Sequence, residues 1–396
     1  MQKTIIAAAV AGLLAMPAFA QTRVVLSGKI NAAWEWHKAT GSTNGANQKM
    51  KDRMTESGSE FHIKAYEDLG NGNQAFVDIQ TAVDIFNGNS PAATPDAGRL
   101  GSRRGAIGLQ GKWGMLQLGK WDLHYNAQIW GGTGPNAALN QMYGAVSLLN
   151  QVGGRSYATM GCRCDNTIRY VTPNISGFQV GLGYTRGTGE ATWQPSSSNK
   201  IDRAFSIQAN YKYGGLKLMV AYWNRKNAQG DIGLNGAQVQ HPKYMASGRG
   251  AAQLRDEQSI RAGVAYSFDM GLTIGVTWDY TETKHKYAAA GVSDLKLKRW
   301  AFAVPVYYKT GPHQINLAYG MADDIDNWND TGAQYWTINY GYAISKRTTV
   351  YAGYAHYKND RYATYDFWSN TAVGTGTTSG AGADPTSFAI GLIHSF

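Results

Sequence analysis

The stretch Ser387–Phe396 reads SFAIGLIHSF, and its side chains alternate in size. A strand turns successive side chains to opposite faces, so one face here is mostly large and apolar and the other mostly small. The large set comprises Phe388, Ile390, Leu392, His394 and Phe396. A last residue that is an outward aromatic is typical of a strand that closes a barrel in lipid, with the ring at the interface.

The first twenty residues, MQKTIIAAAVAGLLAMPAFA, carry one cation at Lys3, then an apolar run, then Ala18-Phe19-Ala20. This layout predicts a cleaved secretory signal over 1–20 and a single mature domain over 21–396. A retained anchor would need about 20 apolar residues without such a cleavage motif. The chain is therefore expected to leave the cytoplasm, and since no later apolar run approaches that length, it would span a membrane only as a barrel.

Composition supports the same class. The mean hydropathy of −0.36 is too polar for a helical membrane protein, whereas a barrel with a polar lumen needs only half of each strand apolar. Tyrosine is frequent, with 24 residues, and glycine reaches 48. The net charge of +10 fits nucleic-acid binding, an anionic surface or a conduit for anions. The cations are scattered and not gathered in a tail or helix, which disfavours nucleic acid.

Alternating segments and turns repeat along the whole chain, and short breaks alternate with long ones. This pattern predicts an all-β, up-and-down antiparallel transmembrane barrel with periplasmic turns and external loops. About sixteen strands are expected, which leaves an aqueous channel. They are placed at 23–37, 55–67, 73–85, 102–111, 114–122, 161–172, 177–187, 201–213, 216–226, 255–268, 271–284, 297–309, 313–321, 333–344, 347–358 and 386–396.

Several short motifs occur in a fixed order along this pattern. They are LSGK at 26–29, EDLGNG at 67–72, IGL at 107–109 with Gly114, LGK at 118–120, NTIRY at 166–170, SKRTTVYAGY at 345–354 and the terminal GLIHSF at 391–396. The ordered set resembles general Gram-negative outer-membrane porins of the β-proteobacterial type. The resemblance implies a homotrimer of 16-stranded barrels in the outer membrane, each with its third external loop folded inward. It also implies contact with outer-membrane lipid and lipopolysaccharide, and recognition of the strand ending in Phe396 by the barrel-assembly machinery.

The third external loop corresponds to the long break at 123–160. From Leu123 to Cys164 there is no Asp or Glu, whereas Arg155 and Arg163 both fall within this range. The family usually opposes a basic wall to loop carboxylates, so this chain departs from the pattern. A net positive constriction is expected, in which anions gain Coulomb energy. Carboxylates supplied from elsewhere in the barrel remain the alternative.

Strand parity selects the cations of the wall. The predicted electropositive constriction comprises Lys29, Lys64, Arg104, Lys120, Arg163 and Arg169, with Glu60, His62, Arg155 and Asp165 as possible modulators. Simple parity turns Lys120 outward, and its inclusion follows the resemblance, which implies a local break at the preceding glycine. Glu60 stands where the family commonly carries an arginine, and it could pair with Arg104 or Lys64 and reduce the local positive field.

Two other sets of residues are given plain structural roles. The only cysteines, Cys162 and Cys164, would share one face of a strand, too stretched for easy closure of a disulfide. They are expected to be two small residues on the outer or interfacial face. The aromatics near strand ends are expected to form interfacial girdles and not a sugar track. They are Trp34, Trp36, Trp278, Tyr280, Trp300, Tyr307 and Tyr308.

The leading functional prediction is a water-filled channel for passive diffusion of small hydrophilic solutes, biased towards anions. A substrate-specific porin for phosphate or carboxylates is the alternative. An outer-membrane hydrolase on a barrel would need a nucleophile and base on neighbouring strands, yet no GxSxG signature occurs and the histidines are dispersed. A purely structural barrel would have a plugged lumen. No enzyme activity, metal or cofactor is expected.

Overall fold

The computed structural model describes residues 23–43, 45–83, 85–86, 100–123, 144–154, 163–187, 201–229, 241, 254–287, 292–367 and 380–396. The predicted signal at 1–20 therefore lies outside the described residues. Within them, no helix is long and apolar enough to cross a membrane.

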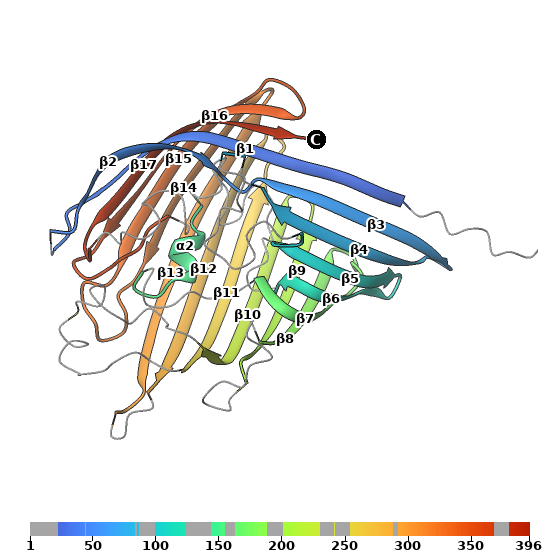
Figure 1. Cartoon of the computed structure of the whole chain (residues 1–396), viewed down its shortest axis with the longest axis horizontal. Coiled ribbons are helices and arrows are strands. Elements are labelled where there is room, and N and C mark those ends of the chain that lie inside the picture. Colours follow the sequence, from blue (N-terminus) through green and yellow to red (C-terminus); the bar gives the residue numbers. More distant parts are fainter. Residues whose placement is uncertain are drawn as a thin grey trace, which may run out of the picture.

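The described chain forms one continuous antiparallel sheet in which consecutive strands pair with each other, except that β2 and β3 both pair with β1 (Figure 1). Seventeen strand segments and one short helix are present over the described ranges. They are β1 (Arg23–Thr40), β2 (Gln48–Glu56), β3 (Glu60–Gly70), β4 (Asn73–Ala82), β5 (Arg104–Gly111), β6 (Gly114–Asp122), α2 (Val146–Asn150), β7 (Arg163–Val171), β8 (Phe178–Arg186), β9 (Arg203–Tyr213), β10 (Leu216–Gln229), β11 (Leu254–Ser267), β12 (Leu272–Lys286), β13 (Leu295–Thr310), β14 (His313–Ala322), β15 (Ala333–Ala343), β16 (Thr348–Asn359) and β17 (Asp384–Ser395).

Two of these segments make up one strand of the barrel. β3 pairs with β1 from Arg23 to Lys29, and β2 pairs with the same edge of β1 further along, from Ala32 onwards. The break between them is filled by side chains: the Ser59 amide donates to the Glu56 carboxylate at 2.6 Å, and the Asn31 amide donates to the Ser59 hydroxyl at 3.0 Å. Counted this way the barrel has sixteen strands, as predicted. The predicted loop at 38–54 is wrong in extent, because β1 and β2 continue into it.

The sheet closes on itself where the first and last strands meet. β1 pairs with β17 from Lys29↔Ser395 to Thr40↔Asp384. Gly28 and Phe396 then exchange two backbone hydrogen bonds of 3.0 Å. The ring of Phe396 covers Gly28 so closely that a Cβ added there would lie 2.3 Å from the ring. Closure removes the free edges that an open sheet would expose.

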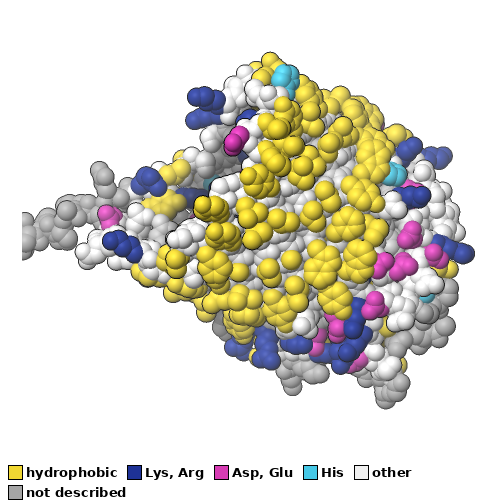
Figure 2. Space-filling view, turned by 180° about the vertical axis from the view of Figure 1, so that it is seen from behind, with side chains coloured by type: hydrophobic (Ala, Val, Ile, Leu, Met, Phe, Trp, Pro, Cys, Tyr) yellow, Lys and Arg dark blue, Asp and Glu magenta, His cyan; other side chains and the backbone are white. Residues whose placement is uncertain are grey.

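The two faces of the barrel have opposite character. Outward side chains such as Ile107, Leu118 and Ile390 are large, apolar and exposed, whereas inward ones such as Gln117 and Asn339 are polar and buried. Figure 2 shows a broad band of hydrophobic side chains on the outside, with charged side chains concentrated along its margins. A soluble barrel would have the reverse arrangement, so the outside is suited to lipid.

The connections also differ between the two ends. At one end β3–β4, β5–β6, β9–β10 and β13–β14 are joined by two-residue turns. At the other end the connections are long, and we call this the long-loop end. The aromatic residues follow the predicted girdle only in part: Trp34 and Trp278 are exposed outside, but Tyr307 has the inward parity of Ala301 and Ala303.

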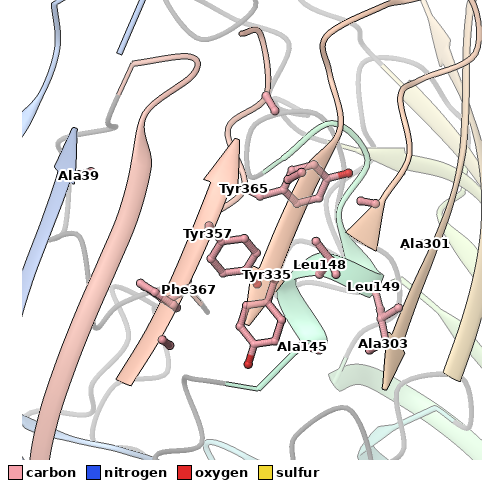
Figure 3. Close-up of a cluster of buried hydrophobic side chains, with 14 of the residues drawn as sticks. Ala39, Ala145, Leu148, Leu149, Ala301, Ala303, Tyr335, Tyr357, Tyr365 and Phe367 are labelled. Atoms are coloured by element: carbon pink, nitrogen blue, oxygen red, sulfur yellow. The ribbon is translucent and has the colours of Figure 1, made fainter. Parts of the chain in front are cut away.

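The lumen is not empty along its whole length. Residues 144–154, including α2, lie against the inside of β13 and β14. Leu148 and Leu149 pack in one buried cluster with Tyr335, Tyr357 and Tyr365 (Figure 3). The middle of the long segment predicted to fold inward therefore contacts the inner wall, while 124–143 and 155–162 lie outside the described residues.

Candidate pore-lining site

A group of arginines lines the inside of β5 and β7, and one aspartate links two of them. Arg104 Nε donates to Asp122 Oδ2 at 2.8 Å, and Arg163 Nε lies 3.7 Å from Asp122 Oδ1. Asp122 ends β6, one residue before the stretch whose lack of acids the sequence analysis noted. A carboxylate therefore does enter the arginine cluster, and it comes from the wall.

Glu60 also contributes a negative charge, but its partners differ from those expected. It accepts hydrogen bonds from Gln80 Nε2 at 2.6 Å and Arg103 Nη1 at 3.4 Å. The predicted pairing with Arg104 or Lys64 is wrong because of register. Glu60 stands opposite Ala82, while Lys64 stands opposite Asp78 four residues along the strand.

The remaining predicted cations fall into two groups. Lys64 pairs with Asp78 at 3.1 Å and Lys120 pairs with Asp165 at 3.3 Å, so both are neutralised locally. Arg169 and Lys29 have no carboxylate within ion-pair distance among the described residues. Lys29 stands opposite Glu60 in the β1–β3 register.

Arg169 lies in an aromatic and amide environment. Its Nη1 donates to Gln117 Oε1 at 3.1 Å, and its guanidinium carbon lies 6.0 Å from the centre of the Trp121 ring. The guanidinium carbon of Arg104 lies 5.0 Å from the same ring. Two arginines therefore share one indole, an arrangement in which each cation is attracted by the ring quadrupole.

The arginine cluster carries an excess of positive charge. We define it as Arg103, Arg104, Arg163 and Arg169. The first three pair with the carboxylates of Glu60 and Asp122, and Arg169 lies beside them across the Trp121 ring. Four positive charges against two negative ones leave two in excess. His62 stands opposite Gln80 on the neighbouring strands, next to this cluster.

A bulge between β6 and β7 shapes the cluster. The register shifts between Gly119 and Trp121, and Asn166 on β7 adopts a left-handed backbone with φ of 52°. Gly119 has φ of 144°, and a Cβ there would lie 2.1 Å from the Gly105 carbonyl oxygen. Only glycine fits this position, and the local break that the resemblance implied before Lys120 is present.

A second charged group, missed by the sequence analysis, holds the segment 144–154. Arg261 of β11 and Arg299 of β13 both bind Asp279 of β12, at 3.0 and 3.2 Å, and all three side chains are buried. Arg299 also donates to the carbonyl oxygens of Leu148, Leu149 and Gln151 at distances from 2.6 to 3.1 Å. We call Arg261, Asp279 and Arg299 the arginine clamp. The alternation of side chains along each strand indicates that all three point into the barrel, but nothing in the sequence shows which backbone groups they bind.

The long connection after β16 covers the same segment from the other side. The Gly153 amide donates to Tyr365 Oη at 3.0 Å, and the Thr364 amide donates to the Gly153 carbonyl at 3.1 Å. Gly154 and Thr364 form a parallel bridge. Two connections far apart in sequence are thus joined inside the long-loop end.

The expectation for the cysteines is wrong. Cys164 is buried and disulfide-bonded, and Cys162 is the only other cysteine in the chain. The prediction assumed a strand through both residues, but β7 begins only at Arg163. Cys162 and Arg155 themselves lie outside the described residues. Over the described ranges, no group of three or more His, Cys, Asp or Glu side chains is arranged to hold a metal ion.

A closed antiparallel barrel with an apolar outside, a charged inside and a segment packed in its lumen defines the class of outer-membrane channels. The family model described as Gram-negative porin matches residues 7–362, and the chain belongs to this family. It is a channel protein of the Gram-negative outer membrane and not an enzyme.

Similar proteins come from β-proteobacteria. An outer membrane porin protein of Bordetella pertussis is 26% identical over 406 residues, covering 95% of this chain and 99% of that protein. Outer membrane porin protein 32 of Delftia acidovorans is 26% identical over 412 residues, covering both chains completely. Among solved structures, the anion-selective porin from Comamonas acidovorans has a TM-score of 0.70 at 19% identity, covering 95% of this chain and 100% of that one.

Proposed function

We propose that this porin is a passive diffusion channel for small hydrophilic solutes and that it favours anions. The observation that carries the proposal is the arginine cluster, with two positive charges in excess on the lumen wall. No acidic residue occurs from Leu123 to Cys164 to offset this excess from the inward segment. The name of the Comamonas acidovorans structure, an anion-selective porin, agrees with this reading.

The selectivity would arise from Coulomb energy in a wet but confined space. At an effective dielectric constant of about 20, a unit charge 4 Å away contributes about 4 kcal/mol, and in bulk water about 1 kcal/mol. Since the lumen is hydrated and salt screens the field, a preference on the order of 1 kcal/mol is expected. That corresponds to a several-fold higher permeability for chloride than for potassium.

The inward segment would set the size limit. Residues 144–154 lie on the inner wall between the arginine clamp and Tyr365. We propose that they belong to the third external loop and narrow the channel opposite the arginine cluster. The long-loop end would then face outside the cell and the short turns the periplasm.

The test is the zero-current potential of the purified protein in a planar bilayer under a potassium chloride gradient. A potential that favours chloride is expected, and Arg169→Gln should reduce it while Arg169→Lys retains it. Lys358→Gln removes one charge from the outer face and serves as the control. A potential that favours potassium in the unaltered protein would refute the anion preference, and absence of conductance would refute the channel.

A substrate-specific anion porin is the second candidate. Arg169 Nε and Gln117 Nε2 are buried and lack hydrogen-bond partners among the described residues. Both groups are donors, and phosphate or carboxylate oxygens would satisfy them. Saturation of the conductance or block of chloride current by phosphate or succinate at millimolar concentration would favour this candidate over a general channel.

The proposed oligomeric state rests on the resemblance to the porin family. We propose a homotrimer in the outer membrane, with the strand ending in Phe396 recognised by the barrel-assembly machinery. A solved OmpT structure of Vibrio cholerae is described as a trimer form, and it shares the fold with a TM-score of 0.58. Lipopolysaccharide would surround the trimer.

A further inference from the structure

Ladder pairing holds the start of β7 on one side only over the described ranges. β6 pairs with it as far as Asp122↔Arg163, whereas the pairing with β8 reaches no further than Thr167↔Thr185. Residues 163–166 therefore form a fringe at the end of the strand. A backbone with ladder hydrogen bonds to one neighbour opens more easily than one that is held from both sides.

The fringe is irregular as well as one-sided. The register with β6 shifts just before Trp121, and Asn166 has a left-handed backbone with φ of 52°. Beyond this bulge, two register pairs with β6 remain in the described part of the chain, Trp121↔Cys164 and Asp122↔Arg163. Two pairs at a strand end do little to fix the direction of the backbone.

The side-chain contacts of the fringe gather at Asp165. Its carboxylate pairs with Lys120 at 3.3 Å, and its carbonyl oxygen accepts a hydrogen bond of 2.5 Å from the Thr185 hydroxyl. Both contacts lie two residues beyond Arg163. The backbone at Arg163 itself therefore depends on its pairing with β6 and on any further constraint in the chain.

A disulfide supplies such a constraint. Cys164 is disulfide-bonded, and Cys162 is the only other cysteine in the chain, so the bond closes a small ring that contains Arg163. A disulfide typically holds its two Cα atoms about 5.5–6 Å apart, whereas residues two apart in an extended strand are about 6.6 Å apart. The bond therefore keeps the backbone at Arg163 from extending fully.

Cys164 fixes one side of this ring in the interior of the barrel. Its side chain is buried, and it belongs to the same buried cluster as Leu123, which follows β6, and Val152 of the inner segment. The arginine clamp in turn holds that segment through the carbonyl oxygens of α2. A covalent ring anchored there restrains Arg163 where the pairing with β8 does not.

Arg163 is also the most loosely paired and most open of the three arginines that meet a carboxylate in the arginine cluster. Its Nε lies 3.7 Å from Asp122 Oδ1, whereas Arg104 Nε donates to the same carboxylate at 2.8 Å. The Arg163 side chain is 38% exposed, against 30% for Arg104 and 14% for Arg103. Its position therefore matters most to a passing ion and is the least secured by its own contacts.

We propose that the disulfide between Cys162 and Cys164 is a redox-sensitive clasp that positions Arg163 in the arginine cluster and so sets the strength of the ion preference. The inference rests on the anion preference proposed above. With the clasp closed, four positive charges face two negative ones. With the clasp open, Arg163 is no longer held beside Asp122, and three positive charges against two leave an excess of one.

The chemistry of opening is thiol–disulfide exchange. A dithiol reductant attacks one sulfur, forms a mixed disulfide, and closes to its own cyclic disulfide as the second protein thiol leaves. Two electrons and two protons pass to the protein, which then carries two thiols. The cysteines are positioning residues, whereas Arg163 is the group that acts on the ion.

The test measures the zero-current potential under a potassium chloride gradient before and after treatment with dithiothreitol. Alkylation of the thiols and the intact mass verify that the bond has opened. We expect the permeability ratio of chloride to potassium to fall roughly two- to three-fold on reduction, because half of the excess charge is lost. The variant C162S/C164S should show the lower ratio without reductant and should not respond to dithiothreitol.

Variants of Arg163 separate positioning from a general loosening of the barrel. R163Q should lower the ratio by a similar factor with the disulfide intact, and C162S/C164S/R163Q should lie no lower than R163Q alone. K358Q removes one charge from the outer face and should keep both the ratio and the response to dithiothreitol. Total conductance and the unfolding temperature in sodium dodecyl sulfate should stay close to those of the unaltered protein in C162S/C164S.

Two results would overturn the inference. The first is an equal ratio in the oxidised protein and in protein whose reduction the alkylation has verified. The second is a further fall when the cysteines are replaced in the R163Q background, which would mean that the bond acts through the inner segment. If the buried bond resists dithiothreitol, C162S/C164S decides, and C162A/C164A replaces that variant if it does not fold.

The same recordings separate this inference from the proposed function. Oxidised, unaltered protein without a chloride preference would refute the proposed function. A chloride preference that persists unchanged after verified reduction would refute the clasp alone.

Discussion

Asp122 is expected to set how much of the arginine cluster's field acts on a passing ion. It binds Arg104 directly and lies near Arg163, so its charge offsets part of the field at the place where the wall is most basic. We expect this carboxylate, which is largely buried on the inner wall, to act on solutes by offsetting the field of the neighbouring arginines. Its removal should therefore change selectivity more than folding.

Asp122→Asn is predicted to increase the preference for chloride. One negative charge is lost while all four arginines remain, and at several ångströms in a hydrated lumen this is worth about 0.5–1 kcal/mol. The permeability ratio from the zero-current potential should rise about two- to five-fold. Asp122→Glu keeps the charge and should leave the ratio near that of the unaltered protein. An unchanged ratio in the asparagine variant would show that Asp122 lies off the path of the ions.

Single residues also mark the limit of sequence reasoning. The inward parity of Arg104 and Arg169 was readable because alternation in a strand is local. The partners of Glu60 were not, because they depend on the stagger between β3, β4 and β5, which no local pattern records. The disulfide of Cys164 was missed for a similar reason, since the strand was assumed to begin two residues too early.

At the scale of elements, the segment 144–154 is held by side chains of three neighbouring strands. Arg261, Asp279 and Arg299 come from β11, β12 and β13 and converge on the carbonyl end of α2. A helix of five residues has little stability of its own, so its conformation depends on these contacts. The length of the 123–160 break predicted a functional loop. The residues that hold this loop in place could be identified only in the folded barrel, because they come from distant strands.

Arg299→Gln is predicted to loosen this segment. The change leaves the buried carbonyl oxygens without this cationic donor and removes one of the two arginines that pair with Asp279, while Arg261 remains. Breaking a buried pair in this way typically costs about 3–5 kcal/mol. Single-channel recordings should then show noisier current with more frequent transitions between conductance levels. Arg347→Gln, at an exposed turn far from the clamp, removes the same charge and should record as the unaltered protein does. Quiet, unchanged current in Arg299→Gln would mean that Tyr365 and Thr364 suffice to hold the segment.

For the whole molecule, the seam between β1 and β17 completes the barrel. The count of sixteen strands was predictable, because each strand is recognisable from its alternating side chains and each turn from its residue types. The close fit at the seam was not, because Gly28 and Phe396 lie at opposite ends of the chain. The ring of Phe396 occupies the space that a side chain at residue 28 would need.

Gly28→Ala is predicted to weaken the seam. The added Cβ would meet the Phe396 ring, and overpacking of this kind typically costs on the order of 1–3 kcal/mol. The temperature at which the barrel unfolds in sodium dodecyl sulfate, read from its electrophoretic mobility, should fall. Gly105→Ala is the control, since a Cβ there meets nothing closer than 3.9 Å. Equal unfolding temperatures for the two variants would show that the ring moves aside without loss.

The hydrogen bond from Gly153 to Tyr365 joins residues 212 apart in the chain and so bears on the timing of biogenesis. The inner segment is synthesised early, yet Thr364 and Tyr365, which bind it, belong to the connection between β16 and β17. Until that connection arrives, the backbone of residues 151–154 lacks the acceptor and donor that Tyr365 and Thr364 supply. We therefore expect this segment to reach its final position only after the wall has formed, so that an incomplete barrel would lack the narrowing that we propose for the mature one.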